Sequence, residues 1–193
     1  MLKLAHCFLL MYFAYSNVFA QMAQEYRIVT DMGNIDIELY SDQAPETVAN
    51  FLRYLSNGFY NDTDFYRVCT PENEAGREIK IQVIQGGMVS EKKLFPPIDL
   101  ETTQKTGLRH QNGTISMARS GPHTAQSSFF ICIGDQPELD YGGMRNPDGQ
   151  GFAAFGKVVR GMDLVKQIQV MENTEQYLQK PVAIRQIKPL ENP

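Results

Sequence analysis

Hydrophobic and polar residues alternate in several short segments, a pattern typical of half-buried β-strands. Residues 26–40 contain two such runs around a glycine-containing turn and predict a β-hairpin. Most connections between the later runs are short, which favours antiparallel pairing. Further strands are predicted at 63–69, 79–87, 112–118, 127–133, 152–159 and 181–190.

Two segments instead carry the apolar spacing of an amphipathic helix. In residues 41–58, Pro45 stands near the first turn and an Asn-Gly pair ends the pattern. A second helix is predicted to begin near Gly161. With few helices among many strands, the chain fits a mainly β fold, a closed barrel capped by two α-helices. The core face of the first helix should carry Val48, Phe51, Leu52 and Leu55.

The chain of 193 residues has the length of one domain and a formal net charge of −4. It shows no basic patch and no RNA-binding motif, so no nucleic-acid partner is expected. Nothing in the sequence requires more than a monomer.

Residues 1–20 differ in character from the rest of the chain. Lys3 is followed by an apolar run and then by small residues, the pattern of a secretory signal peptide. Val18 and Ala20 suit the positions before cleavage, so we expect a mature domain of residues 21–193 in the periplasm or outside the cell. The apolar run is too short for a transmembrane helix, and an uncleaved membrane anchor is the less favoured alternative.

Cleavage would leave Cys69 and Cys132 in an oxidising compartment. They could form one disulfide, or remain free as small apolar residues in the core. Two cysteines without a matching histidine cluster do not make a zinc site, and no metal is expected.

Arg67 is an unusual residue for its surroundings, because Asp64–Val68 otherwise has the aromatic and β-branched composition of a strand. Strict alternation places Arg67 on one face with Phe65 and Cys69. Taken alone, Arg67 fits an ordinary solvent-facing charge.

The familiar sequence signatures of phosphate binding and hydrolysis are missing. The sequence contains no GxxxxGK[ST], GxSxG or HExxH motif. The two histidines outside the signal, His110 and His123, stand in loops without a recognisable nucleophile partner, so ordinary hydrolysis is not predicted.

A different set of motifs remains in the middle and late strands: FYRV, QGG, ISMARSGP, SSFFICIG and FGKVVRGMD. In this order and approximate spacing they resemble the cyclophilin family of peptidyl-prolyl isomerases, in particular its exported bacterial branch. The resemblance runs from about Glu25 to Leu190. It implies an eight-stranded antiparallel barrel with a helix at each end, and an outer groove that binds Xaa-Pro segments of other exported proteins.

The resemblance also assigns roles to individual residues. Arg67 matches the catalytic arginine, Gln85 the groove glutamine, and Ala118 a contact to the substrate backbone. It implies no metal and no cofactor. The remaining substrate-binding positions, which would hold the proline, are Val83, Phe130, Leu139 and Phe152.

Five groove positions depart from the pattern of active members. Gln82 and Val83 replace phenylalanine and methionine, which removes contact area worth about 1–3 kcal/mol if buried. Ser128 replaces glutamine, Glu138 replaces tryptophan, and Phe152 replaces histidine. The loop between Arg67 and Gln85 is also longer by several residues. We therefore expect a working but weaker isomerase with poor cyclosporin binding.

Two other hypotheses remain open. The groove could hold Xaa-Pro segments as a chaperone without useful turnover. The barrel could instead carry a small ligand inside, although large apolar residues at the predicted interior positions argue that it is filled. These interior positions are Ile115, Phe129, Ile131 and Val158.

Overall fold

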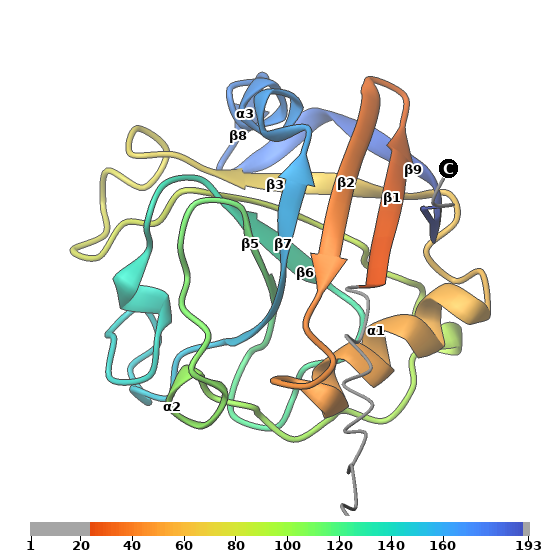
Figure 1. Cartoon of the computed structure of the whole chain (residues 1–193). Helices are drawn as coiled ribbons and strands as arrows, with labels where there is room; N and C mark the ends of the chain where they lie inside the picture. The colour runs from red at the N-terminus through yellow and green to blue at the C-terminus, as the bar shows by residue number, and fades with distance from the viewer. Residues whose placement is uncertain (1–23, 191–193) are drawn as a thin grey trace, which may run out of the picture.

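The computed structural model describes residues 24–190, whose strands form one antiparallel sheet in the order β1-β2-β7-β5-β6-β4-β3-β9-β8. Pairing of β1 with β9 closes eight of these strands into a barrel, and the short β8 remains outside the closure. The predicted eight-stranded antiparallel barrel is confirmed (Figure 1). The strands are β1 Gln24–Thr30, β2 Gly33–Leu39, β3 Thr63–Cys69, β4 Val83–Gly86, β5 Thr114–Met117, β6 Phe129–Cys132, β7 Ala153–Arg160, β8 Asn173–Thr174 and β9 Tyr177–Pro189.

The two predicted helices lie at opposite ends of the barrel (Figure 1). They are α1, Pro45–Ser56, and α3, Met162–Gln169. The sequence pattern did not predict three shorter elements, which contribute single turns within the connections. They are the four-residue helix α2 (Thr103–Thr106) and the 3-10 turns Glu91–Lys93 and Pro137–Leu139.

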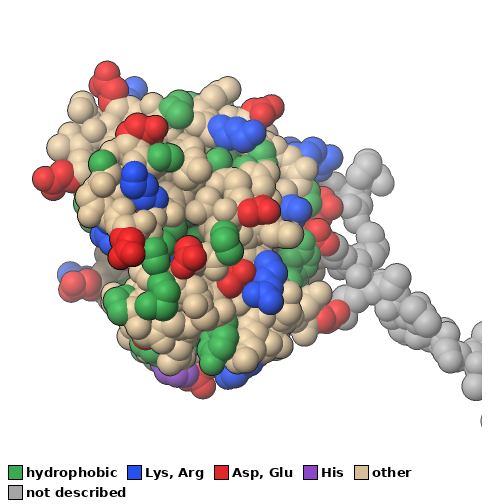
Figure 2. All heavy atoms as spheres, turned by 90° about the vertical axis from the view of Figure 1, so that its left-hand side faces the viewer, with side chains coloured by type: hydrophobic (Ala, Val, Ile, Leu, Met, Phe, Trp, Pro, Cys, Tyr) green, Lys and Arg blue, Asp and Glu red, His purple; other side chains and the backbone are tan. Residues whose placement is uncertain are grey.

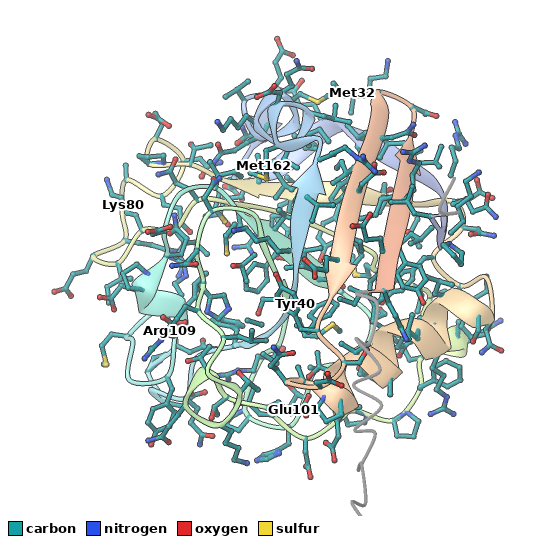
Figure 3. All side chains as sticks on the ribbon, in the orientation of Figure 1. Met32, Tyr40, Lys80, Glu101, Arg109 and Met162 are labelled. Atoms are coloured by element: carbon teal, nitrogen blue, oxygen red, sulfur yellow. The ribbon has the colours of Figure 1, made fainter. Side chains whose placement is uncertain are left out.

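Helix α1 is held at its amino-terminal end by a residue from the long connection that follows β4. The Glu101 carboxylate accepts hydrogen bonds from the backbone nitrogens of Glu46 and Thr47, at 3.2 and 2.8 Å. A carboxylate at this position satisfies free N–H groups and complements the helix dipole. Figure 3 shows Glu101 beside the start of the helix.

The barrel interior is filled by large apolar side chains rather than open for a ligand. Phe51 from α1 packs edge-on against Phe129 at 5.6 Å between ring centroids and also contacts Phe155 at 5.3 Å. All three are fully buried. The interior residues predicted from alternation are buried in the same cluster, namely Ile115, Phe129, Ile131 and Val158.

Strand β4 is shorter than the sequence predicts, because the strand expected over 79–87 forms only at Val83–Gly86. The backbone nitrogen of Ile81 donates to the Glu74 carboxylate at 2.8 Å instead of to a neighbouring strand. Alternation in the sequence continues upstream of Val83, but the backbone nitrogens of Ile81 and Gln82 donate to the side chains of Glu74 and Gln136. Residues 70–82 consequently form a loop, referred to below as the 70–82 loop.

Strand β3 contains a bulge between Phe65 and Arg67. Phe65 and Val68 are fully buried in the barrel interior, whereas Cys69 belongs to a small cluster on the outer wall. The prediction that Phe65 shares a face with Arg67 is therefore wrong. A bulge adds one residue to the strand and shifts the alternation, which turns Arg67 outward.

Cys69 and Cys132 are buried and unpaired. In the sheet register both lie opposite Val83, one on each side of β4. Strands are about 4.8 Å apart, so two cysteines separated by a strand are about 10 Å apart, beyond the reach of a disulfide. The alternative of two small core residues is the one that the structure favours. Burial raises the pKa of the Cys69 thiol to about 11.

The predicted signal peptide lies outside the described residues. Within residues 24–190, no helix combines the length and the apolar character needed to cross a membrane. Figure 2 shows acidic, basic and apolar side chains interspersed on the face that carries the loops at the left of Figure 1.

Candidate functional site

Three neighbouring strands place a row of side chains on the outer wall of the barrel. Arg67 on β3 lies opposite Gln85 on β4, and Gln85 lies opposite Phe130 on β6. Because the register is fixed by the interior packing of the same strands, this row is held by the fold itself.

The row borders a hollow of about 210 Å³ on the barrel surface, referred to below as the outer hollow. All seven residues predicted for catalysis and substrate binding line it. The fold therefore brings together positions that the sequence separates by up to 85 residues, from Arg67 to Phe152. Its lining consists of Arg67, Arg77, Ile81, Val83, Gln85, Ala118, Arg119, Phe130, Leu139, Arg145, Asn146 and Phe152.

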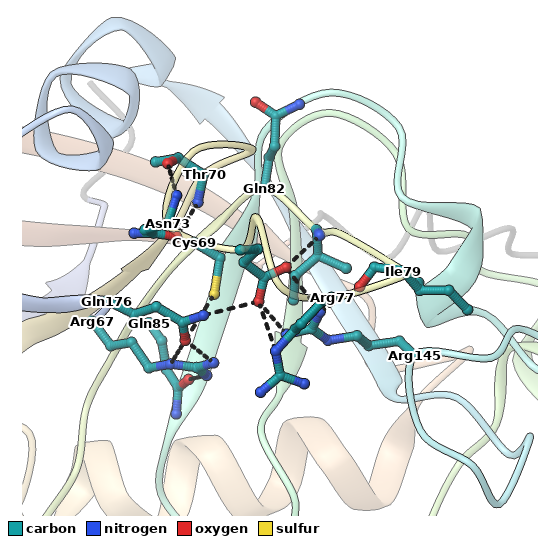
Figure 4. Close-up of polar contacts among 12 residues, drawn as sticks. Arg67, Cys69, Thr70, Asn73, Arg77, Ile79, Gln82, Gln85, Arg145 and Gln176 are labelled. Atoms are coloured by element: carbon teal, nitrogen blue, oxygen red, sulfur yellow. Dashed lines mark hydrogen bonds and ion pairs between the residues drawn. The ribbon is translucent and has the colours of Figure 1, made fainter.

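The Arg67 guanidinium is fixed by two neutral amides (Figure 4). Its Nη1 donates to Gln85 Oε1 at 2.7 Å, and its Nε and Nη2 donate to Gln176 Oε1 at 3.0 and 2.6 Å. Arginine has five N–H donors, so these three bonds leave two for another molecule. Since both partners are uncharged, they orient Arg67 without neutralising it.

Gln85 is itself oriented from its other end. Its Nε2 donates to the Tyr66 hydroxyl at 2.6 Å, and the Tyr66 ring stacks on Tyr177 at 6.4 Å between centroids. Burial raises the pKa of Tyr66, so its hydroxyl stays protonated at neutral pH. This contact fixes which end of the Gln85 amide faces Arg67.

Gln176 is a site residue that the sequence did not indicate. It lies in the turn between β8 and β9 with a φ of 78°, and its Nε2 donates to Glu74 at 3.1 Å. Hydrogen bonds thus connect Glu74 to Gln176 and Gln176 to Arg67. No local motif marks Gln176, because its partner Arg67 is 109 positions away in the sequence.

Glu74 anchors this series from inside the 70–82 loop. Its side chain is fully buried, and it forms a two-pronged ion pair with Arg145, in which one N–H···O distance is 2.8 Å. Burial alone would raise the pKa of Glu74, but hydrogen bonds from Arg145 and from the Ile81 backbone outweigh it and hold this pKa below its ordinary value. The carboxylate is therefore ionised and keeps its acceptor role at neutral pH.

The opposite side of the outer hollow is apolar. Phe130 and Phe152 meet edge to face at 5.4 Å, and Leu139 and Val83 are buried beside them. Ile81 adds a further apolar side chain to this group. Such a surface suits the ring of proline, which has no polar atoms of its own beyond the peptide bond.

His110 and Asp140 form a buried polar pair that lies behind the apolar side of the outer hollow. The His110 ring stacks on Phe130 at 6.0 Å, and His110 lies between Asp140 at 2.8 Å and Ser116 at 2.9 Å. Burial works to raise the pKa of Asp140, but the hydrogen bonds from His110 prevail and hold it below its ordinary value. His110 therefore positions Phe130 rather than facing the hollow.

Arg119 is a second residue that the sequence did not assign to the site, although it directly follows Ala118. It donates to both carboxylate oxygens of Asp148 at 2.7 and 2.8 Å and to the Gly151 carbonyl at 2.7 Å. Its guanidinium lies 5.0 Å from the Phe152 ring centroid. The Arg119 hydrogen bonds lower the pKa of Asp148 to about 2. Arg119 thus fastens the loop that carries Phe152.

The departures from the family pattern have different structural outcomes. Gln82 points away from Arg67 (Figure 4) and does not line the outer hollow. The neighbouring Ile81 does line it and supplies part of the apolar surface that a phenylalanine at position 82 would provide. Glu138 also lies outside the lining, and its carboxylate accepts from the Met144 backbone at 2.9 Å. Ser128 lines an adjacent hollow of about 380 Å³.

Within residues 24–190, no group of histidine, cysteine and acidic side chains is arranged to hold a metal ion. The polar side chains that contact Arg67 and Gln85 are amides and a phenol.

Comparison with known proteins agrees with this arrangement. The sequence profile described as cyclophilin type peptidyl-prolyl cis-trans isomerase/CLD matches residues 26–189. The chain is 38% identical to peptidyl-prolyl cis-trans isomerase A of Dickeya dadantii over 187 residues, covering 91% of this chain and 90% of that one. It is 40% identical to peptidyl-prolyl cis-trans isomerase B of Escherichia coli over 144 residues, covering 72% and 80%.

A solved structure supports the fold independently. The cyclophilin type isomerase of Cryptosporidium parvum superposes with a TM-score of 0.69 at 24% identity, covering 89% of this chain and 99% of that one. A structure of the same protein in the presence of the dipeptide Ala-Pro superposes equally well, at 23% identity and with 88% and 100% coverage. From its sequence, its closed barrel and its relatives, this chain belongs to the cyclophilin-type peptidyl-prolyl cis-trans isomerase family.

Proposed function

We propose that this protein accelerates the cis-trans rotation of Xaa-Pro bonds in exported proteins and so assists their folding, acting as a monomer in the periplasm or outside the cell. The family gives the reaction class. The export rests on the signal-like pattern of residues 1–20, and the assignment of roles rests on the geometry of the outer hollow.

The chemistry needs only a positioned donor and an apolar support. Resonance gives the peptide C–N bond partial double-bond character, with a rotation barrier of about 18–20 kcal/mol. Twisting this bond removes the resonance and returns a lone pair to the prolyl nitrogen. A fixed guanidinium that donates to this nitrogen stabilises the twisted state more than the planar one, which lowers the barrier.

The observation that carries the proposal is the pairing of Arg67 with the apolar side of the same hollow. Arg67 has two N–H groups left to donate and is held by neutral partners, while Phe130, Leu139 and Val83 provide a support for the ring. Proline held against these residues lies within reach of a donor that is already oriented. Little reorganisation is then required at the moment of rotation.

Cis-trans exchange of a short Xaa-Pro peptide tests the enzyme function, because uncatalysed exchange takes tens of seconds or longer. Arg67→Ala should lower kcat/KM by about 10²–10³-fold, the usual effect of removing one transition-state donor. Arg185→Ala is the matched control, since Arg185 is an exposed arginine of β9 paired with Asp31. Equal rates for the protein and Arg67→Ala would refute the role of Arg67.

Export has its own test. Expressed as residues 1–193 in a secreting bacterial host, the protein should be recovered outside the cytoplasm with Gln21 as its first residue. Mass spectrometry and amino-terminal sequencing of the recovered protein measure this directly, and an uncleaved amino terminus in the cytoplasm would contradict it.

The second candidate is a module that binds Xaa-Pro segments without useful turnover. The observation that favours it is the smaller Val83 and Ser128 at positions where active members carry methionine and glutamine. Binding of several Xaa-Pro peptides without any acceleration of their exchange would select this function over the enzyme.

A further inference from the structure

The lining of the outer hollow has an unusual charge composition. Four arginines and no acidic residue belong to it, although the whole chain carries an excess of acidic residues and a formal net charge of −4. Arginines of the lining come from three loops and one strand, so the concentration arises only in the folded chain. These four residues are Arg67, Arg77, Arg119 and Arg145.

Carboxylates behind the lining compensate this charge only in part. Asp148 pairs with Arg119. The single carboxylate of Glu74 is shared by Arg145 and by Arg77, whose Nε lies 3.6 Å away. Two carboxylates therefore face four guanidinium groups, which leaves the hollow with a net positive charge of about two.

The two arginines that share Glu74 differ in their freedom. The Arg145 side chain is 7% exposed and is fastened to both Glu74 and the Ile79 carbonyl, whereas the Arg77 side chain is 55% exposed. Arg145 therefore has a structural task, which is to hold the 70–82 loop. Arg77 keeps donors that can turn toward a bound molecule.

The lining of the outer hollow also contains an amide group without a hydrogen-bond partner. Asn146 Nδ2 is buried and forms no hydrogen bond within the described part of the chain. A buried donor without an acceptor costs about 1–3 kcal/mol. Asn146 lies in the lining together with Arg77 and Arg145, so this unpaired donor belongs to a residue that a bound molecule would contact.

We infer that the wall formed by Arg77, Arg145 and Asn146 is a subsite for a carboxylate side chain, so that the protein prefers Xaa-Pro segments with Asp or Glu next to the proline. This inference rests on the proposed function, because it assumes that proline occupies the apolar side of the same hollow. The apolar residues and this wall line the same hollow of about 210 Å³, so a residue next to a bound proline would lie close to the wall. Guanidinium groups bind carboxylates by paired, charge-assisted hydrogen bonds, which gives this wall its selectivity.

The test uses peptides that differ only at the residues before and after the proline, with Glu, Gln or Lys at each position. Both kcat/KM for exchange and Kd by calorimetry are measured with each peptide. At low ionic strength we expect an approximately 5–10-fold preference for Glu over Gln at one of these positions and a disadvantage for Lys. The preference should shrink as salt is raised, because an accessible ion pair is screened.

Two variants locate the effect. Arg77→Gln should bring the Glu-to-Gln ratio close to one, because it removes the charge that distinguishes the two peptides. Arg185→Gln should keep the ratio, since Arg185 has the same 55% side-chain exposure and a carboxylate partner but lies outside the hollow.

The outcomes separate this inference from the proposed function. Tighter binding of Glu peptides without any acceleration would support the subsite and contradict the enzyme. Acceleration with equal kcat/KM and equal Kd for Glu and Gln peptides at both positions would overturn the subsite and leave the enzyme standing. A Glu preference that survives in Arg77→Gln would also overturn the assignment to this wall.

Discussion

The two sides of the barrel wall differ in how they are built. Phe129 and Phe130 are consecutive residues of β6, yet Phe129 packs in the interior against Phe51, while Phe130 faces the outer hollow. Interior contacts come mainly from the strands and from helices α1 and α3. The outer hollow instead depends on loops, because Glu74, Arg145 and Gln176 fix its polar side from three separate segments.

Within β6, Phe129 therefore contributes to the packed interior, whereas Phe130 contributes to the candidate site. The interior contributes mainly through the removal of apolar area from water and through close packing. The outer hollow is held by hydrogen bonds and ion pairs, and those made by Gln85 and Gln176 orient Arg67. Substitutions in the interior and substitutions at the contacts of Arg67 should therefore act on different measurements.

The largest expected effect on stability comes from the interior. Phe129→Ala should lower the free energy of unfolding by about 3–5 kcal/mol, because it leaves an enclosed cavity. Phe130→Ala should cost less, since its ring borders a hollow that is already open, but should reduce kcat/KM more strongly. Urea unfolding and peptide exchange of both variants measure the contrast. An equal loss of stability and activity in the two variants would remove the distinction between the sides.

The next largest effect on stability should come from the ion pair between Glu74 and Arg145, which lies behind the outer hollow. Glu74→Gln leaves the Arg145 charge buried without its partner, which should cost about 3 kcal/mol or more of unfolding free energy. Glu72→Gln is the control, as Glu72 is exposed in the same 70–82 loop. Equal unfolding midpoints for the two variants would show that the pair does not support the fold.

The contact between Gln176 and Arg67 should affect catalysis and leave stability nearly unchanged. Asparagine tolerates the positive φ of Gln176 but is too short to reach Arg67. Gln176→Asn should therefore lower kcat about tenfold with little change in KM, because the donor loses its fixed direction. Gln179→Asn, an exposed substitution in β9, is the control. A change in KM alone would assign Gln176 to substrate binding instead.

The smallest expected effect is the contribution of the Asp148–Arg119 ion pair to thermal stability, and this contribution depends on pH. Arg119 lowers the pKa of Asp148 to about 2, so the folded state gains stability at pH values above the ordinary carboxyl pKa and loses this gain as the pH falls toward 2. The Tm difference between the protein and Asp148→Asn should thus be constant near neutral pH and vanish as the pH approaches 2. A constant difference down to pH 2 would contradict the role of this ion pair.

The sequence predicted most of the fold because its signals are local. The hairpin, both main helices and the interior positions follow from alternation, helical spacing and turn residues within short windows. The upstream half of the strand expected at 79–87 failed, since the side chains of Glu74 and Arg145 bind the backbone groups of Ile81 and Ile79. The face assigned to Phe65 failed because a bulge is not encoded in a hydrophobic pattern.

For the site, the sequence by itself determined the family resemblance and predicted seven positions, because short motifs mark them in β3, β4 and β6 and in the segments beside the strands. Only the tertiary structure decided what surrounds them. Gln176 reaches Arg67 across 109 positions, Glu74 is buried in a loop of polar composition, and four arginines of separate segments converge on one hollow. Such contacts depend on how loops fold against the barrel, and hydrogen-bond partners far apart in the chain leave no periodic trace in the sequence.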